Sequence, residues 1–222
     1  MKARTQRRPD EAEFDVERWL AEAPNPPPIV QAGATVLRRR ARDVPASLLG
    51  TTALEDLVEV MVEVMRKAPG VGLAAPQLGI PLRVFVAEDL EERVTQLPED
   101  TRAARGRVAL PLMVLVNPRV EAASTEQATF FEGCLSVRGY AALVPRWTAV
   151  SVSGSDARGN PVSVQLHGWP ARIMQHEFDH LDGTLYVDRM LTRSLTSEAE
   201  LPRLSALPVA EVLRDLVEPP RR

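Results

Sequence analysis

The sequence predicts one mixed domain of helices and strands, and three observations indicate this. Apolar residues recur at helical spacing from Leu54 to Met65. Apolar and polar residues alternate from Trp147 to Ser155 and again from Val162 to Leu166, which is typical of strands. The segment Asp156–Asn160 between those strands favours a hairpin loop. A chain of 222 residues is long enough for one sizeable domain with tails.

Residues 1–28 are predicted to form an N-terminal extension or linker. Glu11 to Ala23 has the pattern of a short amphipathic helix. The proline cluster that begins at Pro24 ends it, because proline lacks the amide donor and blocks a helix. The alternative to a linker is that this helix docks a protein partner. Residues 29–44 are expected to be irregular, with a short strand at most.

The first half of the domain contains one clear helix. Thr52 to Glu55 has the spacing of a capping box, and the helix that starts there is expected to reach about Lys67. Residues 82–87 and 111–116 are predicted strands. The charged segment 88–107 contains a proline and is predicted to be a loop or an insertion.

A second helix is predicted from Trp169 to Asp182, after the hairpin. Residues 191–222 are predicted to be a C-terminal tail, because prolines interrupt them repeatedly. Within this tail, Val209 to Val217 is expected to form one short helix. The domain proper therefore spans residues 29–190.

Composition excludes several classes of protein. A net charge of −3 argues against a nucleic-acid binder, which usually carries a basic face. No apolar run approaches the roughly 20 residues of a membrane span. The basic N-terminus lacks the apolar stretch of a secretory signal. Cys134 is the only cysteine, so no intrachain disulfide can form, and we expect a reducing, cytoplasmic location.

The strongest chemical signal is the pattern His-Glu-x-x-His at residues 176–180. On a helix, His176 and His180 lie on one face, one turn apart, and can bind one metal ion. Glu177 lies beside the first histidine, where its carboxylate can reach a metal-bound water. The chain contains three histidines in total, so two of them are used here. A divalent ion needs at least a third protein ligand.

Four candidates for the third ligand remain open. One protease class places a third histidine six residues after the second, but this position holds Tyr186. A second class uses a downstream glutamate, for which Glu198 and Glu200 are available. Cys134 follows a glycine and would supply a thiolate. His167 is the fourth candidate, although we expect it to pack or to form hydrogen bonds near the site.

Three separated segments resemble the signature motifs of the peptide deformylases, in the same order and spacing. They are Gly70–Gln77 (GVGLAAPQ), Glu132–Ser136 (EGCLS) and Gln175–His180 (QHEFDH). The resemblance covers roughly residues 29–190 and points to type 1, the branch that includes organellar members. It implies an α+β fold in which antiparallel sheets surround a central metal-binding helix.

The resemblance also implies the roles of the site residues. The metal ligands would be Cys134, His176 and His180. Glu177 would be the general acid and base, and the Gln77 amide with the Leu135 backbone N–H would donate to the oxyanion. The ion would be iron(II), with zinc, nickel or cobalt as alternatives. The alternative function is a metallopeptidase whose third metal ligand is Glu198 or Glu200.

The implied reaction is hydrolysis of the N-terminal formyl group of formyl-methionyl nascent peptides, with release of formate. We expect the ribosome as a further partner, and neither a membrane nor a nucleic acid. The residues expected to bind the substrate are Gly70, Val71, Gly72, Phe130, Gly133, Trp169 and Ile173.

Overall fold

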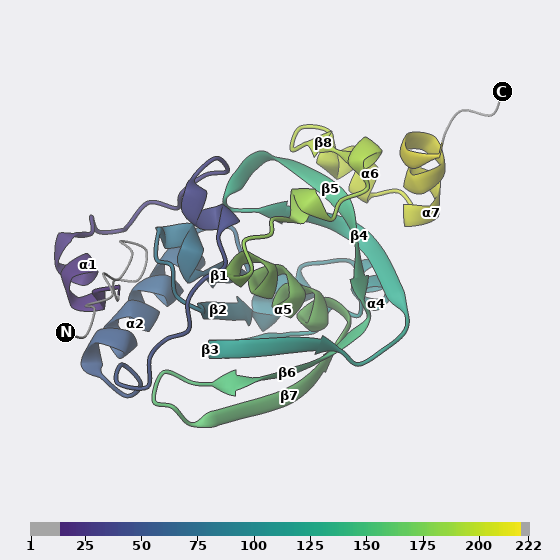
Figure 1. The fold of residues 1–222 in the computed structure, drawn as a ribbon. Helices are drawn as coiled ribbons and strands as arrows, with labels where there is room; N and C mark the ends of the chain where they lie inside the picture. Colours follow the sequence, from purple (N-terminus) through teal and green to yellow (C-terminus); the bar gives the residue numbers. More distant parts are fainter. Residues whose placement is uncertain (1–13, 219–222) are drawn as a thin grey trace, which may run out of the picture.

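The computed structural model describes residues 14–218, so the predicted start of the first helix, at Glu11, lies outside the described residues. Two antiparallel sheets and a helix between them form the body of the molecule (Figure 1). That helix is α5 (Gly168–Leu181), and it carries the His-Glu-x-x-His pattern. The predicted α+β class, with antiparallel sheets around the metal-site helix, is confirmed.

The larger sheet has five strands in the order β1-β2-β3-β6-β7. All neighbouring strands in it pair antiparallel. The strands are β1 (Gly72–Ala74), β2 (Val84–Asp89), β3 (Leu110–Ala122), β6 (Ala149–Ser155) and β7 (Pro161–His167). The predicted hairpin joins β6 to β7.

The smaller sheet has three strands in the order β4-β5-β8. Its strands are β4 (Gln127–Cys134), β5 (Val137–Trp147) and β8 (Thr196–Ser197). The pairing of β4 with β5 shifts register between Gly133 and Cys134, at the end of the ribbon next to its turn. β8 comes from the C-terminal tail and pairs with the opposite edge of β5.

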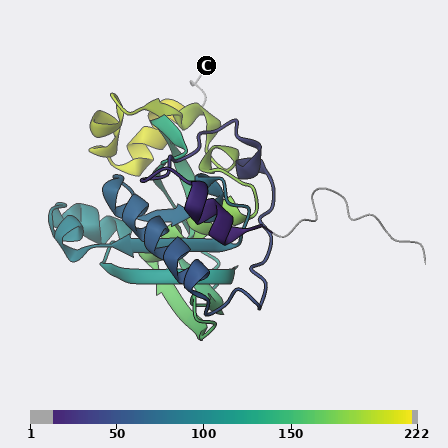
Figure 2. The ribbon, with the colours of Figure 1, turned by 90° about the vertical axis from the view of Figure 1, so that its left-hand side faces the viewer.

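Strand β2 is buried along its whole length because helices cover both faces of the sheet around it. Val84 and Val86 pack in one core cluster with α2 (Thr52–Lys67). Phe85 and Ala87 point the other way, into the cluster that contains the buried face of α5. Successive side chains of a strand point to opposite faces, so this one short strand packs against α2 on one face and against α5 on the other. Figure 2 shows α2 running across this sheet.

The remaining helices are short. They are α1 (Val16–Glu22), α3 (Glu91–Thr95), α4 (Glu99–Arg105), α6 (Leu201–Ser205) and α7 (Val209–Val212), with 3-10 turns at Thr35–Arg38, Ala75–Leu78, Tyr186–Asp188 and Thr192–Ser194 and a π turn at Leu213–Val217. Helix α1 packs on α2 through Val16, which is buried in the core. Among the described residues, no helix is long and apolar enough to cross a bilayer.

Two segments differ from the prediction. Residues 88–107 contain the end of β2 and the helices α3 and α4, because acidic residues in the first turn of each helix favour a start there. Strand β3 does not stop at Asn117 but continues past Pro118. A register shift between Val116 and Arg119 accommodates the proline, which cannot donate to the ladder.

Candidate active site

Three potential metal ligands meet where α5 crosses the turn between β4 and β5. The ligand atoms of Cys134, His176 and His180 all lie within 4.8 Å of one another. The Cys134 Sγ and the His180 Nε2 are 3.3 Å apart. Among the residues that the structure describes, neither Glu198 nor Glu200 belongs to such a group. His167, at the end of β7, is exposed and also lies outside it.

The orientation of His176 is fixed by Glu132. The His176 Nδ1 is 3.0 Å from the Glu132 Oε2, so an N–H at this nitrogen donates to the carboxylate and leaves Nε2 for a metal. Glu132 is buried. Burial alone would raise its pKa, but hydrogen bonds from His176 and Arg146 hold the pKa of Glu132 well below its usual range. The carboxylate is therefore ionised.

A buried chain of charges continues behind Glu132. Arg146 binds Glu132 through two nitrogens, each at 3.0 Å, and donates to the Asp179 Oδ2 at 2.5 Å. Arg189 in turn binds both oxygens of Asp179, at 2.6 and 2.7 Å. Arg172 adds a third cation, 2.6 Å from the Glu132 Oε1. Bidentate arginine–carboxylate pairs hold both partners in one geometry, which keeps His176 rigid.

His180 is the more deeply buried imidazole. Burial, together with the nearby His176, lowers its pKa well below the ordinary value of histidine. It is therefore neutral near pH 7, the state that binds a metal. Its Nδ1 is buried and has no hydrogen-bond partner among the described residues.

Gln77 is held with its amide nitrogen toward the cysteine. Its Oε1 accepts from the Ala74 backbone N–H at 2.8 Å. Its Nε2 lies 3.3 Å from the Ser136 Oγ and 3.6 Å from the Cys134 Sγ. Because the carbonyl end is occupied, the two N–H donors of Gln77 face the ligand group. The side chain is buried, so this orientation is fixed.

Glu177 lies against the backbone of Gly72. A Cβ at Gly72 would be 2.2 Å from the Glu177 Oε1 and 2.5 Å from its carboxyl carbon, so only glycine fits this contact. The Glu177 Oε2 is buried and has no partner among the described residues. Burial raises the pKa of Glu177 to about 7, and the neighbouring charge of His176 opposes the rise. Such a carboxyl can exchange a proton near neutral pH.

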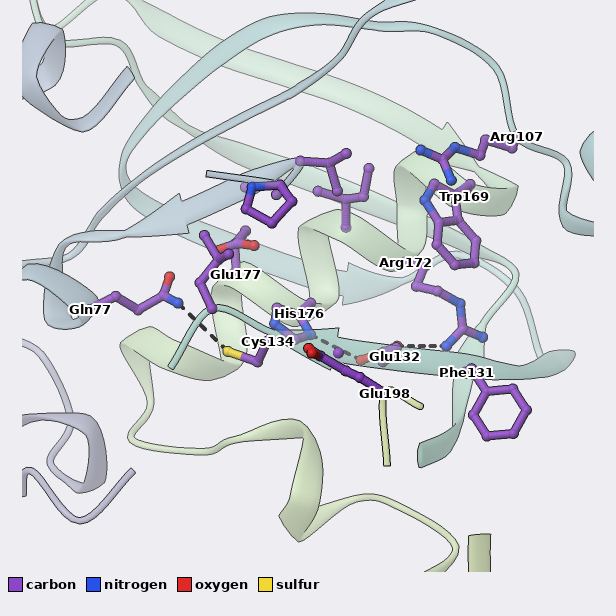
Figure 3. A pocket seen from close by; sticks show the side chains of 17 residues that line it. Gln77, Arg107, Phe131, Glu132, Cys134, Trp169, Arg172, His176, Glu177 and Glu198 are labelled. Atoms are coloured by element: carbon purple, nitrogen blue, oxygen red, sulfur yellow. Dashed lines mark hydrogen bonds and ion pairs between the residues drawn. The ribbon is translucent and has the colours of Figure 1, made fainter. Parts of the chain in front are cut away.

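A cavity of about 320 Å³ opens over these groups (Figure 3). Cys134, His176 and Glu177 line it, with Gln77 at one end and Trp169 with Arg107 at the other. The further lining residues are Pro69, Gly70, Val71, Gly72, Phe131, Glu132, Gly133, Leu135, Arg172, Ile173 and Glu198.

Most of the expected substrate residues line this cavity, but Phe130 does not. Its neighbour Phe131 lines the wall, whereas Phe130 lines an adjacent cavity and contacts the edge of Trp169, with ring centroids 6.2 Å apart. Arg107 and Arg172 also line the cavity and were not predicted from the sequence, whereas Glu198 was considered only as a metal ligand. Arg172 had a usable signal, because a charged residue one turn before His176 on a buried helix requires a buried partner.

Comparison with known proteins is consistent with this geometry. Residues 26–195 match the family model of polypeptide deformylase. The chain belongs to the polypeptide deformylase family. Peptide deformylase 1 of Streptomyces coelicolor is 49% identical over 87% of this chain and 86% of its own length. Peptide deformylase 1A of Arabidopsis thaliana, a chloroplastic and mitochondrial protein, is 46% identical over 83% of this chain.

The alignment spans about two thirds of two plant relatives, 66% of peptide deformylase 1A of Solanum lycopersicum and 67% of the Arabidopsis thaliana protein. A solved class I type b peptide deformylase from Acinetobacter baumannii, with Met-Ala-Ser bound, superposes with a TM-score of 0.64 at 34% identity, covering 73% of this chain and 97% of that one. The bacterial and organellar relatives agree with the type 1 branch that the sequence indicates.

The donor set of this deformylase fits a divalent metal. A sulfur atom and two imidazoles converge, one imidazole is oriented by a carboxylate, and the other is held neutral by burial. Thiolate and imidazole together suit zinc and the neighbouring first-row metals. The cysteine–histidine–histidine group is the one typical of peptide deformylases.

Proposed function

We propose that this deformylase hydrolyses the formyl group of formyl-methionyl peptides through a metal held by Cys134, His176 and His180. The observation that carries the proposal is the meeting of this ligand group with the buried Glu177 carboxylate in one cavity. Family membership supports the reaction class, since the relatives are peptide deformylases. A metallopeptidase with a downstream glutamate ligand has no such support.

We propose iron(II) as the resident ion, with zinc, nickel or cobalt as ions that the same donors accept. When bound, the ion lowers the pKa of a water molecule and polarises the formyl carbonyl. Metal analysis of protein purified without air distinguishes the four ions.

In this proposal Glu177 moves the proton. Its carboxylate accepts a proton from the attacking water and then donates it to the departing amine nitrogen, which produces formate and a free amino terminus. The Gln77 Nε2 and the Leu135 backbone N–H donate hydrogen bonds to the carbonyl oxygen as it becomes negative. One such donor contributes about 3–4 kcal/mol to the transition state.

The apolar part of the cavity would take the methionine side chain. Val71, Trp169 and Ile173 supply apolar surface to the lining of the cavity. Gly70 and Gly72 let the peptide backbone come close, and Gly133 does the same from strand β4. We extend the proposal to nascent chains as substrates, to ribosome association and to a cytoplasmic location. The division into an extension (1–28), a catalytic domain (29–190) and a tail (191–222) also stays a prediction.

The test compares formate release from a formyl-methionyl peptide with cleavage of the same peptide without the formyl group. We expect formate from the first and no peptide-bond cleavage in either. Glu177→Ala should retain metal and lose turnover, whereas Cys134→Ser should lose metal or change the preferred ion. Near-normal turnover by Glu177→Ala would remove Glu177 from the role of general base.

A further inference from the structure

Glu198 reaches the active-site cavity from the C-terminal tail. It lies just past the residues that match the family model, which end at 195. Strand β8 brings it there, because Thr196 and Ser197 pair with β5 and the Glu198 backbone N–H donates to the Gly139 carbonyl at 2.9 Å. Figure 3 shows its side chain at the edge of the cavity away from Arg107.

Glu198 differs from the other acidic and basic side chains that line the cavity, which are paired or, like Glu177, buried. The Arg107 guanidinium is paired with Asp89, at 2.8 and 3.0 Å. Glu132 and Arg172 are buried and paired with each other. By contrast, Glu198 is exposed, and its carboxylate has no hydrogen bond or ion pair among the described residues.

An exposed carboxylate at the mouth of a peptide-binding cavity attracts cations. A formylated substrate has no α-ammonium group near the reacting carbonyl, so a cation can come only from a side chain further along the peptide. Lysine and arginine have long side chains whose charged ends can reach the rim while the backbone stays in the cavity. Arg107, Glu132 and Arg172 are already paired. Glu177 is buried against Gly72 and is not exposed at the rim.

We propose that Glu198 is a specificity-determining residue that favours substrates with lysine or arginine at one of the two positions after formyl-methionine. This inference rests on the deformylase function proposed above and deepens it. The ion pair would form at the surface, where such pairs have modest effects. We expect kcat/KM to be about two- to fivefold higher for a lysine peptide than for its glutamate counterpart. Raising the ionic strength should remove most of the difference, because salt screens exposed charges.

The experiment measures kcat/KM for formyl-Met tripeptides that carry lysine, alanine or glutamate at the second or third position. It compares the wild type with Glu198→Gln and Glu200→Gln. Glu200 is a matched control, because it lies two residues further on in the same tail, does not line the cavity and is paired with Arg203 at 3.1 Å. Both variants change the net charge equally.

The lysine-to-glutamate ratio should fall to about one in Glu198→Gln and stay at the wild-type value in Glu200→Gln. Glu198→Lys should invert the ratio. An unchanged ratio in Glu198→Gln, or an equal fall in both glutamine variants, would overturn the proposal. Failure of the deformylase function itself is distinguishable, because the wild type would then release no formate from the alanine peptide.

Discussion

Gly72→Ala is expected to lower kcat about a hundredfold without removing the metal. The new Cβ would stand 2.2 Å from the Glu177 Oε1, 2.5 Å from Cδ and 2.7 Å from Cγ. Non-bonded heavy atoms normally approach to about 3.5 Å, so the carboxylate must move by roughly 1 Å. A displacement of this size at a catalytic group can cost about a hundredfold in rate. The three atoms nearest to the added carbon all belong to Glu177 rather than to a metal ligand.

The assay follows formate release from a formyl-methionyl peptide, together with the metal content of the purified protein. Gly70→Ala is the comparison, because its Cβ would meet the end of the Leu135 side chain at 2.9 Å, and that end can rotate away. The loss of kcat in Gly70→Ala should stay below about tenfold. Adding Gly72→Ala to Glu177→Ala should lower kcat little further, since both substitutions act through the Glu177 carboxylate. A kcat within about threefold of the wild type would refute the reasoning.

Three further predictions concern the support of the site and the stability of the fold. Glu132→Gln removes the charge that orients His176 and should weaken metal affinity about 10–100-fold in a chelator competition; unchanged affinity would contradict this. Gly183 has φ +72°, and a Cβ there would lie 2.8 Å from backbone, so Gly183→Ala should destabilise the protein by about 1–3 kcal/mol in urea unfolding. The Arg66 hydrogen bonds lower the pKa of Glu88, against an opposing effect of burial. The folded pKa is the lower one, so this stabilisation is present at neutral pH and is lost as pH falls through it. Arg66→Ala should therefore lower the free energy of unfolding at neutral pH but hardly at a pH below the folded pKa of Glu88. An equal loss at both pH values would argue against a stabilising Arg66–Glu88 pair.

Local signals were enough to predict the helices that position the site. The helix at Thr52–Lys67 ends where its apolar spacing predicts. The predicted capping box at Thr52 is wrong by one residue, because the N-cap is Thr51, whose hydroxyl accepts from the Leu54 N–H at 3.4 Å. The metal-site helix begins one residue earlier than Trp169 and ends one before Asp182. The buried face of Thr52–Lys67 can be read from the sequence spacing. Helix α5 is buried on most sides, so its spacing marks no single buried face.

The β4–β5 ribbon was not predicted as paired strands, although it carries Cys134. Gly139 and Pro145 interrupt the alternation of β5, and partners across a ribbon are not marked by spacing in one strand. The sequence points to Phe130 as a substrate residue, whereas its neighbour Phe131 lines the cavity, and the reason is related. Adjacent strand residues point to opposite faces, and the sequence does not say which face meets the cavity. The buried partners of Glu132 likewise depend on tertiary packing.

Cys134 has a practical consequence because it is the only thiol in the chain. In most enzymes, alkylation spreads over several cysteines and says little about any one of them. Here, each modified thiol is a metal ligand. After brief exposure to an alkylating reagent, the mass spectrum of the intact protein therefore gives the fraction of molecules in which the Cys134 sulfur is free. Metal bound through this sulfur would appear as protection, whichever ion the protein carries.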